Sequence, residues 1–171
     1  MRRILVIAGL LLLNTLLQTV IWPEFSFWQS YPDFLLVTVV AFALLEGGVS
    51  ASIIGMCGGL LLDSFSGPLG LMALVYLLIG QLAGLLFYRK VYVDGFVVPT
   101  LISIGFCIPW LLVQVIALLI GGWQVQVQYY LLRHFFPALL GTALLAPAVF
   151  QLIKRLHKCK WMYKSRYDYF D

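Results

Sequence analysis

Long runs of apolar residues, separated by short polar breaks, occupy most of this 171-residue chain. A helix that crosses a membrane needs about 20 mostly apolar residues, and runs of this kind predict such helices. The pattern predicts an all-α membrane bundle with six segments: residues 4–21, 34–45, 49–62, 69–88, 96–120 and roughly 129–153. We therefore expect one integral membrane domain over residues 1–171.

The second and third segments, residues 34–45 and 49–62, are shorter than a bilayer requires. At about 1.5 Å per residue they cover only about 18 and 21 Å of a hydrocarbon core that is about 30 Å thick. Irregular backbone at membrane depth is tolerated only where other protein surrounds it. We expect either short spanning helices or a re-entrant pair that the other helices shelter.

Composition supports a membrane protein and excludes a water-soluble domain. Apolar residues make up 63% of the chain and charged residues 11%, whereas soluble domains carry about 25% charged residues. The basic start, Arg2 and Arg3, could belong to a signal peptide, but no cleavage site of small residues follows, so we expect a retained first span. The three cysteines match neither a disulfide framework nor a metal-binding spacing.

Basic residues predict the orientation, because Lys and Arg accumulate in cytoplasmic loops. With six segments and both termini in the cytoplasm, ten of the eleven basic residues lie inside and Arg133 is the one outer cation. A five-span arrangement would place one basic terminus outside, so we reject it. The basic, aromatic-rich tail, residues 154–171, is expected to lie on anionic headgroups at the cytoplasmic face rather than to bind nucleic acid.

Catalytic spacings are absent from the sequence. It contains no His-Glu-x-x-His, no paired cysteines and no Gly-x-x-x-x-Gly-Lys. His134 adjoins the outer mouth of the last span and His157 lies in the basic tail, where both are expected to be interfacial polar residues. We predict that the chain is not an enzyme and that it holds no cofactor and no metal.

Small residues recur at every fourth position in three segments. Ala51, Gly55 and Gly59 form one stripe, Gly80 and Gly84 form a second, and Ala138, Thr142 and Ala146 form a third in the last span. This spacing lets helix backbones approach closely. We expect the stripes to pack inside the bundle, with a partner-facing surface as the alternative, and the sequence leaves a homo-oligomer open.

Polar residues within or beside the apolar segments are candidates for contacts between helices. Asn14 and Gln18 are one helical turn apart and predict hydrogen bonds between helices, with a ligand-lining role as the alternative. Asp33 follows a proline and is expected in the first turn of a helix, where the helix dipole favours a carboxylate.

Asp63 is expected to end a helix, where the dipole opposes a carboxylate. The following loop is predicted to cap it, with binding to a partner as the alternative, and Pro68 suits the first position of the next helix. Arg133 is predicted to pair with Asp33, with Asp63 or with the loop carbonyls, and snorkelling to headgroups is the alternative. The structural or partner-contact candidates are Asn14, Gln18, Asp33, Gly55, Gly59, Asp63, Gly67, Pro68, Gly70 and Arg133.

Taken in order, these features resemble the family of the rod shape-determining protein MreD of bacterial cell-wall elongation. The resemblance rests on the basic start, the paired short segments, a fourth span that ends in Arg89-Lys90, and three short motifs: Pro32-Asp33, Leu60-Leu61-Leu62-Asp63 and Ser66-Gly67-Pro68-Leu69-Gly70. It implies a non-enzymatic, multi-pass scaffold in the bacterial cytoplasmic membrane. The implied partners are the single-span protein MreC and, with it, RodA and its transpeptidase partner.

A second class of protein has a similar size. The substrate-binding membrane subunits of energy-coupling-factor vitamin transporters are also compact six-span proteins, and they need a cavity with convergent polar groups. Mid-membrane positions of this chain offer few such groups: Asn14, Gln18, Tyr76, Gln81 and Gln114. That set is sparse for a polar vitamin, so transport is the less favoured function.

Overall fold

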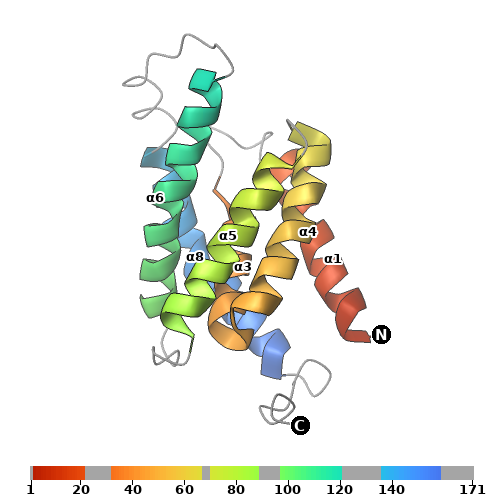
Figure 1. Cartoon of the computed structure of the whole chain (residues 1–171). Coiled ribbons are helices and arrows are strands. Elements are labelled where there is room, and N and C mark those ends of the chain that lie inside the picture. The colour runs from red at the N-terminus through yellow and green to blue at the C-terminus, as the bar shows by residue number, and fades with distance from the viewer. Residues whose placement is uncertain (1, 22–31, 67–69, 89–96, 121–135, 159–171) are drawn as a thin grey trace.

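The computed structural model describes residues 2–21, 32–66, 70–88, 97–120 and 136–158. All regular structure in these ranges is helical, which confirms the predicted all-α fold. The elements in order are α1 (Arg2–Leu16), the π-helical turn η1 (Leu17–Ile21), α3 (Phe34–Glu46), α4 (Gly48–Ser66), α5 (Leu71–Phe87), α6 (Val97–Ile120) and α8 (Phe136–Lys158). Figure 1 shows the six α-helices of the described residues as an upright bundle.

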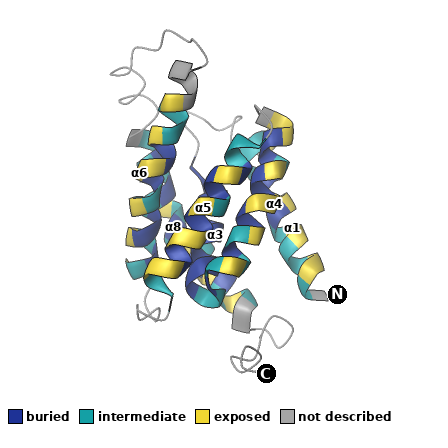
Figure 2. Ribbon diagram, in the orientation of Figure 1, coloured by how far each residue is buried: buried dark blue, intermediate teal, exposed yellow. Residues whose placement is uncertain are grey.

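The short helix α3 lies at the centre of the bundle. It contacts α1, α4, α5, α6 and α8, and every residue from Phe34 to Leu44 is buried. A helix that is apolar on all sides is stable only where other helices or lipid cover all of it. The surrounding helices turn their exposed faces outward, as the yellow ribbon in Figure 2 shows, so α3 meets protein rather than lipid.

Four helices among the described residues are long and apolar enough to cross a membrane. The stretches of these helices that could span a membrane are Arg3–Val20, Gly48–Phe65, Val97–Ile116 and Pro137–Leu156. The other two, α3 with 13 residues and α5 with 17, are shorter apolar helices. Exposed leucines, isoleucines and valines line the outward faces of the outer helices, as the hydrocarbon of a membrane requires.

The third segment is longer than the sequence predicted. Helix α4 has 19 residues and continues to Ser66 instead of ending at Leu62. The helix includes Asp63 and Ser64 because their side chains are hydrogen-bonded. The Ser64 hydroxyl donates to the Leu60 carbonyl over 2.9 Å, and the Asp63 carboxylate accepts backbone N–H groups at the start of the next helix. Of the two segments expected to be short, α3 alone falls well below the length of a span.

Two other boundaries differ from the prediction. Helix α5 begins at Leu71 with Gly70 as its N-cap, so Pro68 is not its first residue. Gly70 has a φ of 100°, a left-handed conformation that favours glycine. Helix α8 continues beyond residue 153 to Lys158, because cations in a last helical turn are favoured by the helix dipole. The predicted part of this segment before residue 136 lies outside the described residues.

Helices α4 and α5 make the closest backbone approach described. A Cβ atom on Gly55 would lie 2.6 Å from the Tyr76 carbonyl oxygen, and one on Gly59 would lie 2.5 Å from Ala73 Cα. From the opposite helix, a Cβ on Gly84 would lie 2.1 Å from the backbone nitrogen of Gly48, too close for any side chain. The small-residue stripes of α4 and α5 therefore face each other in a contact inside the bundle.

Candidate functional site

Asp33 forms the centre of a buried polar cluster. It is the N-cap of α3 and is 5% exposed. Its Oδ1 accepts the backbone N–H of Leu36 over 2.9 Å, and its Oδ2 accepts the Tyr76 hydroxyl over 2.6 Å. Its own backbone N–H donates to Thr142 Oγ1 over 3.1 Å. A carboxylate is favoured here because it caps the first turn of a helix and faces the positive end of its dipole.

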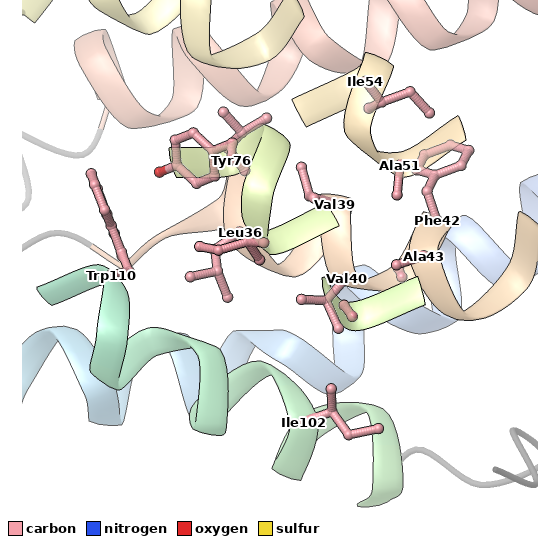
Figure 3. Close-up of a cluster of buried hydrophobic side chains, with 14 of the residues drawn as sticks. Leu36, Val39, Val40, Phe42, Ala43, Ala51, Ile54, Tyr76, Ile102 and Trp110 are labelled. Carbon is pink, nitrogen blue, oxygen red and sulfur yellow. The ribbon is translucent and has the colours of Figure 1, made fainter. Parts of the chain in front are cut away.

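Tyr76 and Trp110 extend this cluster to a fourth helix. The Tyr76 ring on α5 is fully buried, and its centroid lies 5.2 Å from that of Trp110 on α6. Figure 3 shows the two side chains near each other and near Leu36, and their ring planes are tilted by 45°. Thr142 on α8 donates its hydroxyl to the Ala138 carbonyl over 2.7 Å, which leaves its oxygen free to accept the Asp33 amide.

We call Asp33, Tyr76, Trp110 and Thr142 the Asp33 cluster. Its members come from α3, α5, α6 and α8, so one carboxylate and its neighbours fix four helices relative to one another. The sequence placed Asp33 at a helix start, but Trp110 and Thr142 were missed as its neighbours. Both lie in apolar runs far from Asp33 along the chain, and no spacing rule connects them.

Two polar contacts hold α1 against α3. Asn14 Nδ2 donates to Thr38 Oγ1 over 2.7 Å, a hydrogen bond between helices. At the other end, Arg3 forms an ion pair with Glu46, whose side chain is 5% exposed. Gln18, one turn from Asn14, has a buried Oε1 with no hydrogen-bond partner among the described residues.

Asp63 caps the helix that follows it. Its Oδ2 accepts the backbone N–H groups of Gly70 and Ala73 over 2.9 and 3.1 Å, and its Oδ1 accepts that of Met72 over 3.2 Å. The carboxylate is buried at the N-terminus of α5, whose dipole favours a negative charge. This interaction offsets the unfavourable position of Asp63 near the C-terminus of α4.

The remaining candidates separate into two groups. Gly55 and Gly59 lie in the contact between α4 and α5. Gly67, Pro68 and Arg133 lie outside the described residues, and with Arg133 so does its predicted pairing with Asp33 or Asp63. In the part of the chain that the structure describes, no group of three or more His, Cys, Asp or Glu side chains could hold a metal ion.

The chain is similar to one family of known proteins. The family model of the rod shape-determining protein MreD matches residues 1–158. The chain belongs to the MreD family. No curated protein and no solved structure matches it. Membership confirms the resemblance found in the sequence and gives the chain a role in rod shape determination. The MreD family is a structural, shape-determining membrane family and not a known enzyme family.

Proposed function

We propose that this MreD-family chain is a non-enzymatic scaffold of the cell-wall elongation machinery in the bacterial cytoplasmic membrane. In this proposal it binds the single-span protein MreC and, with it, RodA and its transpeptidase partner. The observation that carries the proposal is that the buried polar residues of the described ranges hydrogen-bond within the bundle, either to a neighbouring helix or to the backbone of their own helix. Family membership supports the shape-determining role.

A catalytic site or a polar ligand cavity needs several polar groups that converge on one space. Each buried polar residue of the described ranges instead hydrogen-bonds within the bundle: Asn14, Thr15, Asp33, Thr38, Asp63, Ser103 and Thr142. Two of the groups that could have lined a vitamin cavity, Asn14 and Tyr76, are among the groups bonded in this way. This favours a scaffold over the transporter subunit.

We further propose that the chain crosses the membrane several times with both termini in the cytoplasm. The ion pair between Arg3 and Glu46 supports this, because it brings the start of α1 to the end of α3. Gly47, which follows α3, lies against the Tyr88 ring at the end of α5, so three inner ends meet at one face. Reporter fusions after Asp171 and within residues 24–30 test the orientation, and a periplasmic C-terminus would exclude it.

Depletion in a rod-shaped bacterium tests the scaffold function. We expect depleted cells to become round and wild-type protein to restore the rod. The tagged protein, purified in mild detergent, should carry MreC, while an unrelated six-span protein with the same tag controls for carry-over. Normal shape after depletion, combined with thermal stabilisation of the purified protein by a vitamin, would support the transporter class instead.

A further inference from the structure

Helix α5 exposes one polar side chain within an apolar surface. Gln81 is exposed and stands six positions before Phe87, the last residue of α5, which is about 9 Å along the helix axis. The exposed residues one turn away from it on either side are Leu78 and Leu85. An amide among such residues has neither water nor headgroups beside it in a membrane, so its hydrogen bonds must come from protein.

The Gln81 side chain has one hydrogen-bond partner in the part of the chain that the structure describes. The Ser52 hydroxyl on α4 lies 2.7 Å from the Gly48 carbonyl oxygen and 3.0 Å from Gln81 Oε1. An amide has two N–H donors and an oxygen with two lone pairs. The two Nε2 donors therefore have no acceptor among the described residues, and Oε1 can accept a second bond.

The other exposed glutamine of the described residues has a different setting. Gln151 is exposed on α8, but Lys154 and Arg155 follow it within about one turn. Near such a basic helix end, lipid headgroups and water supply hydrogen-bond partners. Gln18 and Gln114 are half-buried. Gln81 is thus the one exposed glutamine of the described ranges that apolar side chains surround.

Gln81 belongs to a continuous surface made by α4 and α5, which lie side by side (Figure 1) and carry exposed residues on their outward faces (Figure 2). Residues three, four or seven positions apart share one face of a helix, and the contact between Ser52 and Gln81 joins the two faces. The close backbone approach of Gly48 and Gly84 fixes them relative to each other. We call this surface the Gln81 face; its exposed residues are Val49, Met56, Leu74, Leu78, Gln81 and Leu85.

We propose that the Gln81 face joins two copies of this chain in a symmetric dimer, in which the two Gln81 amides hydrogen-bond to each other. Each amide donates one Nε2–H to the Oε1 of the other, so two hydrogen bonds form and the contacts with Ser52 are kept. The site is incomplete in one copy, because its donors find their acceptor only on the second. This inference goes beyond the scaffold function and does not depend on it.

Symmetry favours a second copy over other occupants of this face. Two copies that insert in the same orientation place each residue at the same depth, so a two-fold axis along the membrane normal beside Gln81 brings each amide to its own copy. An amide is complementary to itself because it carries both donors and acceptors. Lipid acyl chains offer no acceptor. A second copy therefore supplies, at the required depth, the acceptor that Gln81 lacks.

Photocrosslinking in cells that make two differently tagged copies of the full chain locates the contact. A crosslinking amino acid at Leu78 or Leu85 should give a product that carries both tags. The same amino acid at Leu12 on α1 or Leu101 on α6 should not, although these leucines are 53% and 62% exposed. The proposal is wrong if Leu78 and Leu85 capture only lipid, only a different protein or nothing, or if the control positions capture a second copy equally well.

Substitution of the amide tests the chemistry. Energy transfer between labelled copies of the purified chain, in vesicles of phosphatidylethanolamine and phosphatidylglycerol, measures the dissociation constant of the dimer. Gln81→Leu should raise this constant by about tenfold, because two hydrogen bonds between helices are lost, while the helix content measured by circular dichroism stays that of wild type. Gln81→Asn keeps an amide and should raise it less.

Gln151→Leu is the matched control, because it removes the exposed amide of α8 and should leave the dissociation constant unchanged. A wild-type constant for Gln81→Leu, or an equal rise for Gln151→Leu, would overturn the proposal. The measurement needs no other protein, so the dimer can fail while the scaffold function stands, and the scaffold function can fail while the dimer stands.

Discussion

Replacing Gly84 by alanine is expected to force α4 and α5 apart. The added Cβ would lie 2.1 Å from the backbone nitrogen of Gly48 and 2.2 Å from its Cα. Ordinary van der Waals contact begins near 3.4 Å, so the two backbones must separate by about 1.3 Å. No side chain can rotate to relieve this contact, because both obstructing atoms belong to the backbone.

The size of the effect follows from two opposing contributions. Overpacking a protein interior typically costs about 1–3 kcal/mol, and a rigid backbone contact belongs in the upper part of that range. Alanine also favours a helix over glycine by about 1 kcal/mol. We therefore expect Gly84→Ala to destabilise the purified protein by about 1–2 kcal/mol. Gly105→Ala, which adds the same atom in open space, should instead stabilise it by up to about 1 kcal/mol.

Equilibrium unfolding in mixtures of sodium dodecyl sulfate and a mild detergent, followed by circular dichroism, measures both variants. The two should differ by about 2–3 kcal/mol in free energy of unfolding. If Gly84→Ala were as stable as Gly105→Ala, the close approach of α4 and α5 would not exist in the folded protein. The matched pair separates this steric effect from helix propensity, which both substitutions change in the same direction.

The same unfolding measurement checks three further expectations. Tyr76→Phe leaves the buried Asp33 Oδ2 without its hydroxyl donor and should cost about 1–3 kcal/mol; wild-type stability would mean that this bond is not made. Asp63→Ala removes the acceptor of three amides at the start of α5 and should cost about 0.5–2 kcal/mol, with part recovered in Asp63→Asn. Asn14→Leu and Thr38→Val should couple in a double-mutant cycle by about 0.6–1.7 kcal/mol, and strictly additive losses would contradict their contact.

The sequence predicted the helices well because long apolar runs carry a strong signal. For residues 34–45 it left two alternatives, a short spanning helix or part of a re-entrant pair that other helices shelter, and the structure adds that the other helices bury α3. It did not predict the end of α4, because Asp63 and Ser64 are typical of a loop when read alone. Their place in a helix depends on hydrogen bonds to Leu60 and to the start of α5, and the apolar pattern carries no information about these bonds.

The polar contacts were predicted less completely than the helices. Asn14 was expected to bond to another helix, but nothing in the sequence distinguishes Thr38, which lies in an apolar run, as its partner. The ion pair between Arg3 and Glu46 had a usable signal, because the charge pattern places both on the predicted cytoplasmic side. The Asp33 cluster had none, since Asp33 and Thr142 are 109 residues apart and only the packing of α8 against α3 brings them together.

Because other helices enclose α3, its burial can be completed only late in the synthesis of the protein. The thirteen residues of α3 are too few to remain as a stable span by themselves. Two of the helices that cover α3, namely α6 and α8, emerge from the ribosome only after α5. At about 5–20 residues per second, the 109 residues between Asp33 and Thr142 take roughly 5 to 20 s to make. Until α6 and α8 are made, α3 is covered on only part of its surface, by α1, α4 and α5. A chain truncated before α8 therefore leaves part of α3 exposed, and membrane proteases can recognise it as incompletely folded.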